Sequence, residues 1–279
     1  MFLFVTNTAI VLFADLYSFY SNANNYWDFD RSDDIVDNIT SRKSHTQGTI
    51  STTRSPAGTG LLVQKGALIN LNKYNPNGIA DDNDPVGCLD PVTCTKGFTV
   101  SVFIKVIGTN EEFQNNIFLF GNRIDESYKG WSVGVLGKKL QVFVSTNEYV
   151  CSLNSFIQWN VMANVWFLLA FTWKDPKSGG SLEVITDSNR FHTSIDISCL
   201  LLPSSQRLLN LRFKIGSDLT PIAAEYDNLA IWQTVRSINE IRAAWTYTVG
   251  MQVCLLKIVR ICKVQWDQIN TVSKGKCLY

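Results

Sequence analysis

One stretch of the sequence decides the fold: Cys88-Leu-Asp-Pro-Val-Thr-Cys94, followed after a turn by Gly97-Phe-Thr-Val-Ser-Val-Phe-Ile-Lys105. Two cysteines bracket a short Asp-Pro loop, as they would in a small disulfide loop. From Phe98 onward apolar and polar residues alternate, with Val102 or Phe103 as the next inward position, which is typical of a strand. Secreted β-sandwiches use such a loop to pin the edge of a sheet.

Composition narrows the class of protein. The chain has 279 residues, of which 46% are hydrophobic and 12% aromatic, enough to fill a core between two sheets. The formal net charge is +1 and no basic stripe stands out, so we expect no nucleic-acid partner. There are seven cysteines, no CxxC pair, and only two histidines, His45 and His192. These counts favour disulfides in an oxidising compartment over a zinc site.

The N-terminal region predicts export. Residues 1–23 are mostly apolar and end in the small-x-small site Ser21-Asn-Ala23, so we interpret them as a signal peptide. A first buried strand and a misplaced start codon are the alternatives. The sequon Asn38-Ile-Thr40 predicts N-glycosylation at Asn38 and agrees with a secreted, extracellular protein.

The C-terminal region differs in character from the middle. Residues 246–279 form a divergent tail rich in Val, Leu, Ile and Cys, interrupted by Lys257, Arg260 and Lys263. These charges argue against a membrane span, so the chain is predicted not to be membrane-spanning. The tail is interpreted as an amphipathic helix, with a truncated further module or a wrong exon boundary as alternatives.

Residues 24–245 have the pattern of short strands and turns that is typical of an all-β domain. Short apolar or alternating segments recur between clusters of Gly, Asn, Asp and Lys, which predicts a sandwich or barrel. The stretch from Arg31 to Thr59 is rich in Ser, Thr and Asp and is expected to be a surface connection with little core content. The expected strands are Tyr26–Asp30, Ala67–Leu71, Phe98–Lys105, Ile117–Gly121, Trp131–Leu136, Leu140–Ser145, Val165–Trp173, Leu182–Thr186, Leu211–Gly216 and Tyr226–Trp232.

One helix is specified by its first turn. Ser237-Ile-Asn-Glu240 matches the capping box, in which the serine and glutamate side chains each bond the other residue's backbone N–H. Ile238, Ile241 and Trp245 then fall on one helical face, which is expected to dock against a sheet. The helix is predicted from Ser237 to Trp245.

The order of these motifs carries a family resemblance. The motifs are Trp27–Asp30, Cys88–Cys94, Gly97–Phe103, Asn164–Trp173, Phe213–Gly216, Tyr226–Trp232 and Ser237–Ile241. From about Tyr26 to Trp245 the chain resembles the laminin-G-like/pentraxin-like branch of the concanavalin A-like lectin/glucanase superfamily. The resemblance implies an all-β, two-sheet antiparallel jelly-roll sandwich with one short C-terminal helix. It departs from the family pattern at Gln64-Lys-Gly66 and at Thr186-Asp-Ser-Asn189, which puts two loops in doubt but leaves the strand pattern in place.

The resemblance also implies disulfides and a cation. It implies that Cys88 bonds to Cys94, and Cys151 with Cys199 is the further expected pair. Binding members of the fold often hold Ca²⁺ at a rim through carboxylates, so Ca²⁺ is the candidate cofactor. The candidate ligands are Asp81, Asp82, Asp84 and Asp90, with Asp28 and Asp30, or Asp33 and Asp34, as further contributors. A solvated acidic loop is the alternative interpretation.

No catalytic constellation is present in the sequence. Paired carboxylates for glycoside hydrolysis are not found, because Glu183 and Asp187 have the wrong spacing and Asp125-Glu126 lies in an expected turn. The histidines are expected at the surface, and no Gly-x-Ser-x-Gly elbow occurs. Asp227 is expected to make a structural hydrogen bond rather than to ligate a cation.

The aromatic residues divide into two groups. The first group is expected to fill the core and consists of Trp27, Trp131, Trp166, Trp173 and Trp232. Tyr149 and Trp159 lie near loops and are the candidates for an exposed platform. We therefore predict a non-catalytic recognition or adhesion module, not an enzyme, whose rim loops and concave sheet bind an extracellular glycan or protein partner. The alternatives are a structural fragment of a larger adhesion receptor or matrix protein, and a glycosidase.

Overall fold

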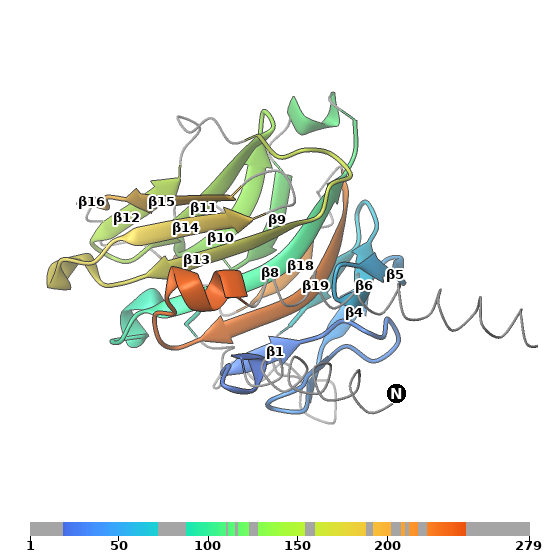
Figure 1. Ribbon diagram of the computed structural model, residues 1–279, viewed down its shortest axis with the longest axis horizontal. Helices are drawn as coiled ribbons and strands as arrows, with labels where there is room; N and C mark the ends of the chain where they lie inside the picture. The colour runs from blue at the N-terminus through green and yellow to red at the C-terminus, as the bar shows by residue number, and fades with distance from the viewer. Residues whose placement is uncertain are drawn as a thin grey trace, which may run out of the picture.

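Two antiparallel sheets pack face to face in a β-sandwich (Figure 1). The structure is a computed structural model, and it describes residues 19–243 apart from 72–87, 110, 115–116, 123–127, 154–159, 188–191, 202–207, 210–211 and 217–221. The described part of the chain confirms the predicted all-β sandwich.

The first sheet, called sheet 1, has the strand order β15-β14-β13-β8-β19-β6-β5, and β1 also pairs with β19. Every pair in it is antiparallel. Its strands are β1 (Asn25–Trp27), β5 (Ile50–Ser55), β6 (Gly58–Val63), β8 (Phe98–Ile107), β13 (Phe167–Trp173), β14 (Leu182–Asp187), β15 (His192–Ile197) and β19 (Ala223–Trp232).

The second sheet, called sheet 2, has the order β16-β12-β11-β10-β9-β18-β7-β4, and β17 pairs in parallel with β10. Its strands are β4 (His45–Gln47), β7 (Leu68–Asn70), β9 (Ile117–Gly121), β10 (Tyr128–Leu136), β11 (Lys139–Ser145), β12 (Tyr149–Leu153), β16 (Leu200–Leu201), β17 (Leu208–Leu209) and β18 (Lys214–Gly216). A separate hairpin joins β2 (Val36–Asp37) to β3 (Arg42–Lys43).

Strand β8 is buried over most of its length because both of its faces are covered. Its residues at even positions from Phe98 to Val106 belong to the core between the sheets. Phe103 points the other way and packs outside sheet 1 with Leu168 and Ile241. The structure therefore assigns Val102, not Phe103, to the inner face.

A β-bulge in β19 reverses which residues point inward. Between Asp227 and Ala230 the register advances three residues along β19 but only two along β8, and Asn228 has a positive φ of 50°. Tyr226 lies in the core, and unbroken alternation would send Trp232 there too. The extra residue instead directs Leu229 inward and Trp232 outward. The expectation that Trp232 fills the core between the sheets is therefore wrong.

The other tryptophans mostly follow the prediction. Trp27, Trp131 and Trp173 are buried in the core between the sheets. Trp166 precedes β13 and is only half-buried outside sheet 1, where the Lys105 ammonium lies 5.3 Å from its ring centre. The prediction of a core position for Trp166 is wrong because sheet 1 has a second apolar face.

That outer face is covered by two segments from opposite ends of the described chain. Residues 238–243 form a helix that lies across β8 and β13 (Figure 1), with Ile241 against Phe103. Its capping box is confirmed, since Ser237 N–H donates to the Glu240 carboxylate (2.8 Å) and Glu240 N–H to Ser237 Oγ (3.3 Å). The predicted last residue of the helix, Trp245, lies outside the described residues.

The second covering segment comes just before β1. Phe19 and Tyr20 pack on Trp232, with ring centres 4.9 and 6.2 Å from it, and Ala23 is buried in the same cluster. The rest of the predicted signal peptide, residues 1–18, lies outside the described residues. The predicted tail, residues 246–279, also lies outside them.

The stretch between Arg31 and Thr59 is not a plain surface connection. It contains β2, β3, β4 and β5, and the start of β6, and Ile35 is buried in the core. The prediction missed these strands because β4 and β5 lie at sheet edges and carry mostly polar side chains. The expected strand at Leu211–Gly216 is shorter than predicted, and β18 begins at Lys214.

Candidate functional site

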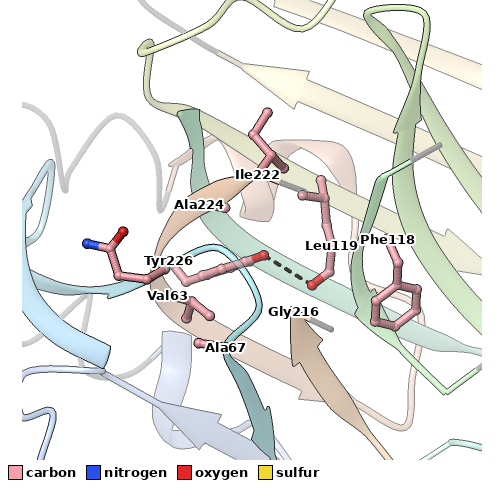
Figure 2. A pocket seen from close by; sticks show the side chains of 9 residues that line it. Val63, Ala67, Phe118, Leu119, Gly216, Ile222, Ala224 and Tyr226 are labelled. Carbon is pink, nitrogen blue, oxygen red and sulfur yellow. Dashed lines mark hydrogen bonds between the residues drawn. The ribbon is translucent and has the colours of Figure 1, made fainter. Parts of the chain in front are cut away.

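A small cavity lies between the sheets, where β9 of sheet 2 faces β19 of sheet 1 (Figure 2). Val63, Leu119, Ile222 and Tyr226 line it, and the Tyr226 hydroxyl donates a hydrogen bond to the Leu119 carbonyl oxygen (3.0 Å). Its volume of about 10 Å³ is room for one water molecule. It is therefore a packing defect and not a ligand site.

A larger pocket lies at the other end of the sandwich, where three loops from the two sheets meet. We call it the rim pocket, and its volume is about 80 Å³. The loops are the disulfide loop, the β11–β12 turn and the β13–β14 turn, which projects at the left end of the molecule in Figure 1. The lining residues are Val92, Thr146, Asn147, Glu148, Tyr149, Trp173, Asp175 and Lys177.

The β11–β12 turn is held in shape by Thr146. Its Oγ1 accepts hydrogen bonds from the backbone N–H groups of Glu148 (3.1 Å) and Tyr149 (2.9 Å), while its own N–H donates to the Tyr149 carbonyl (2.9 Å). A threonine hydroxyl used in this way fixes a tight turn without help from the rest of the protein. The turn therefore presents Asn147 and Glu148 in a set geometry.

The β13–β14 turn is organised by Asp175. The turn contains a short 3-10 helix, η3 (Pro176–Ser178), and Asp175 Oδ1 accepts from the Lys177 N–H (3.0 Å) at its start. The Lys177 ammonium then reaches across to Glu148 Oε1 (2.8 Å), which joins the two turns over the pocket. This hydrogen bond with Glu148 raises the pKa of Lys177.

The disulfide loop is pinned onto sheet 2. The Trp131 indole N–H donates to the Cys88 carbonyl (2.9 Å), and the Asn122 amide donates to the Leu89 carbonyl (2.9 Å). A bond joins Cys88 to Cys94, as predicted, with Cα atoms 5.7 Å apart. The loop thus holds Val92, whose side chain is 52% exposed, at the mouth of the pocket.

The second predicted disulfide lies beside the same pocket. Cys151 of β12 is bonded to Cys199, which directly precedes β16. The bond fixes β16 to the edge of sheet 2, where Leu201 lies directly opposite Tyr149. Leu201 is 64% exposed, so an apolar surface continues outward from Tyr149.

Trp173 forms part of the pocket wall from the core side. Its ring packs against Phe98, with centres 5.7 Å apart, and the side chain is 1% exposed. Its indole N–H is buried and has no hydrogen-bond partner within the described residues.

The predicted calcium ligands are only partly described. Asp81, Asp82 and Asp84 lie outside the described residues, so that prediction stays untested. Asp90 is described, and its carboxylate pairs with Lys129 (2.8 Å) and accepts from the Val92 N–H (3.3 Å). It therefore has a structural role in the disulfide loop.

The alternative acidic pairs have protein partners. Asp33 pairs with Arg31 (3.4 Å), Asp34 pairs with Lys43 (2.9 Å), and Asp28 accepts from the Asn38 amide (2.6 Å). Burial, and then the neighbouring Asp28, raise the pKa of Asp30. In the described part of the chain no three His, Cys, Asp or Glu residues gather as a metal site would require.

The residues weighed for catalysis do not meet in one place. His45 is exposed on β4 and His192 lies on β15, in the other sheet. Glu183 and Asp187 are at opposite ends of β14. Asp125, Glu126 and the aromatic candidate Trp159 lie outside the described residues. Of the two aromatic residues proposed for an exposed platform, Tyr149 lines the rim pocket.

Asp227 is buried at the bulge and bonded as expected. The Ser55 hydroxyl donates to its carboxylate, and the neighbouring Asn228 accepts from the Tyr26 hydroxyl. Burial raises the pKa of Asp227 well above its ordinary value, and burial likewise raises the pKa of Tyr20 and Tyr26. With 1% exposure, Asp227 serves the fold rather than a ligand.

Asn38 is at the tip of the β2–β3 hairpin. It lies in the turn between Asp37 and Arg42, and its side chain is exposed. An exposed hairpin turn is accessible to a glycosyltransferase, so the predicted glycosylation is compatible with this position. Whether the asparagine is modified stays a prediction.

Most of the rim pocket could not be predicted from local sequence. Tyr149 and the disulfide loop were predicted as site elements, but Glu148, Asp175 and Lys177 were not. The available signal was the turn chemistry itself: Thr146 and Asp175 each begin a short polar turn directly after a strand. What the sequence could not supply is that these turns lie at the same end of two different sheets.

Comparisons of the sequence with known proteins found no match. No known family model matches the chain. No curated protein matches it by sequence. In the described residues no helix is long and apolar enough to cross a membrane.

Solved structures are similar in fold. The botulinum neurotoxin serotype D binding domain has a TM-score of 0.54 at 14% identity, covering 84% of this chain and 52% of that one. The binding domain of botulinum neurotoxin DC in complex with rat synaptotagmin II gives 0.55 at 9% identity, covering 82% and 52%. The botulinum neurotoxin type G receptor binding domain gives 0.52 at 10% identity, covering 82% and 52%.

At these identities the likeness shows the fold alone. The chain spans about half the length of the solved chains it matches. All three are neurotoxin binding domains, so the laminin-G-like/pentraxin-like resemblance stays a prediction.

Proposed function

We propose that this chain is a non-catalytic extracellular recognition module that binds a glycan or a protein partner through the rim pocket and its surrounding loops. The observation that carries the proposal is the convergence of three ordered loops at one end of the sandwich. Loops held by a rigid scaffold are where binding residues are usually placed. The laminin-G-like resemblance of the sequence supports the same class of function.

The solved structures with this fold support a binding role. Their names describe binding domains, one of them a receptor binding domain and another in complex with rat synaptotagmin II. A sandwich that serves recognition in those proteins is a suitable scaffold for recognition here, although a fold hosts many functions. The rim pocket of this chain is therefore the part on which the proposal depends.

The two disulfides support an extracellular setting. Both lie in or beside the loops of the rim pocket, and such bonds persist in oxidising compartments. We propose that they keep the loop shapes constant outside the cell, where no chaperone restores them.

The test is binding of the fluorescently labelled chain to cell surfaces, compared between the natural chain and a Tyr149→Ala variant. The proposal expects saturable binding that falls about tenfold in affinity when the aromatic ring is lost, a change of about 1.4 kcal/mol. Leu136→Ala is the matched control, because Leu136 is 39% exposed at the end of β10, opposite the first residue of β11, and lines no part of the pocket. Equal binding by both variants would refute the assignment of the site.

The structural alternative is that the chain is a fragment of a larger adhesion receptor or matrix protein. It expects no binding by the isolated chain and adhesion only when the chain is placed in a longer gene product. The cell assay separates the two candidates directly.

Glycoside hydrolysis is the enzymatic alternative at the same pocket. Glu148 and Asp175 both line it, but the first is paired with Lys177 and the second organises its turn. A non-catalytic module binds saccharide without consuming it. Release of reducing sugar that disappears in a Glu148→Gln variant would replace the binding proposal by an enzymatic one.

A further inference from the structure

We infer that the rim pocket takes an uncharged pyranose ring of a saccharide and rejects acidic glycans. This inference rests on the proposed function and names the ligand class of the same site. It follows from three properties of the pocket: its aromatic walls, its polar groups and its net charge.

The aromatic walls suit the apolar face of a sugar. Tyr149 of sheet 2 is half-buried, so part of its ring is open to a ligand, while the buried Trp173 of sheet 1 forms the wall on the core side. The C–H groups on one face of a pyranose need such an apolar surface, because a flat ring buries area there at little entropic cost. Leu201 extends the apolar surface beyond Tyr149 and would contact the next residue of a glycan chain.

The polar groups suit hydroxyls. Asn147 supplies a planar amide that both donates and accepts, and Asp175 supplies carboxylate acceptor sites beyond the one bonded to Lys177. Donors and acceptors on planar groups can each bond two adjacent hydroxyls of one ring.

The net charge decides between neutral and acidic sugars. Among the lining residues Glu148 and Asp175 are negative and only Lys177 is positive, which leaves one net negative charge. Lys177 is moreover paired with Glu148 across the pocket, so its charge is largely compensated. A carboxylate or sulfate on the ligand would be brought toward like charge while losing water, which is unfavourable.

The size of the pocket limits what enters it. A volume of about 80 Å³ admits the edge of a single ring, and the rest of the glycan must remain outside along Tyr149 and Leu201. Recognition is thus expected at a terminal residue, with weak affinity for a free monosaccharide and stronger binding to a longer chain.

The experiment uses the full chain and a glycan array that contains neutral glycans and their sialylated and sulfated counterparts, such as lactose beside 3′-sialyllactose. Hits are titrated by calorimetry. We expect neutral glycans to bind and their acidic counterparts to bind about tenfold more weakly or not at all. A tenfold difference in affinity corresponds to about 1.4 kcal/mol. Tyr149→Ala should lose the binding and Leu136→Ala should keep it.

A charge reversal makes the test specific. Glu148→Lys changes the net charge of the pocket from negative to positive and leaves the turn-forming Thr146 in place, so it should narrow or invert the preference for lactose over 3′-sialyllactose. Thermal unfolding of each variant shows that it is folded. An unchanged preference in folded Glu148→Lys would overturn the charge argument.

The outcomes distinguish this inference from the proposed function. Preferential, Tyr149-dependent binding of acidic glycans would overturn the inference and leave the recognition role intact. Silence on the array with Tyr149-dependent binding to cells would also overturn it, in favour of a protein partner at the same site. Absence of both array and cell binding would overturn the inference together with the proposed function.

Discussion

At the scale of single residues, the chain places a few polar groups where their ordinary properties change. Asp227 is the clearest case. It is buried at the β19 bulge, where the Ser55 hydroxyl donates a hydrogen bond to it, and burial favours its neutral form. A carboxyl group held in this way stabilises the fold only while it is protonated.

Asp227 therefore predicts a pH dependence of stability. Its pKa is higher in the folded chain than in the unfolded chain, where it is about 3.9, so the folded state holds the proton more tightly. As pH rises from that value toward the folded pKa, the unfolded state loses its proton first and the free energy of unfolding falls. Asp227→Asn should remove this decline, as measured by urea unfolding across a pH series.

Asp33→Asn is the control for this experiment. Asp33 is exposed and its pKa is lowered by the Arg31 side chain, the opposite direction. That variant should retain the decline of the natural chain. Parallel curves for the natural chain and Asp227→Asn would mean that the carboxyl group is not buried as described.

At the scale of elements, the junction between the disulfide loop and β8 depends on Gly97. This residue has a φ of 75°, and a Cβ atom there would overlap the Trp173 carbonyl oxygen on the neighbouring strand. The disulfide loop can therefore approach β13 closely enough to form one side of the rim pocket. A larger residue would force the loop away from it.

We expect Gly97→Ala to destabilise the protein by about 1–3 kcal/mol more than Gly137→Ala. Both glycines have positive φ, 75° and 56°, but a Cβ atom at Gly137 meets nothing within 4 Å. The pair thus separates backbone strain from the clash with Trp173. Chemical unfolding of both variants measures the difference, and equal losses would contradict the close approach.

Some strands could be predicted from the sequence and others could not. Alternation alone located β8, β9, β11 and β14 to within two residues, because their inner faces are strongly apolar. It failed for β5, whose side chains are mostly Ser, Thr and Arg at a sheet edge. Short polar edge strands have no apolar period to detect, since they bury little surface.

The candidate site was less predictable than the fold. Tyr149 and the Cys88–Cys94 loop were identified from local sequence. Glu148 and Lys177 were not, because they are 29 residues apart and meet only when sheets 1 and 2 stack. Local pattern predicts elements, whereas a pocket made by loops of two sheets depends on their packing.

At the scale of the whole molecule, the predicted secretion can be tested through Asn38. The described chain exposes this asparagine on the β2–β3 hairpin, away from the core. When the chain is secreted from cells that glycosylate, we expect an N-linked glycan there and a shift in electrophoretic mobility on enzymatic removal. Asn38→Gln should abolish the shift, and Asn147→Gln, at an asparagine without a sequon, should retain it.

A shift that survives Asn38→Gln would place the glycan elsewhere. A natural chain that is secreted without any shift would refute the predicted modification. In either case the two disulfides remain a separate test of export, because peptide mapping without reduction should recover Cys88 with Cys94 and Cys151 with Cys199.

The extra residue in β19 has a consequence for comparing this chain with distant relatives. Any alignment that matches β19 to an uninterrupted strand must open a gap between Asp227 and Ala230. Without that gap, Leu229 to Trp232 would be paired one position out of phase, and a tryptophan buried on the outer face of sheet 1 would be aligned with residues that face the core between the sheets. The placement of this gap therefore decides whether the second half of β19 aligns correctly with the corresponding strand of a distant relative.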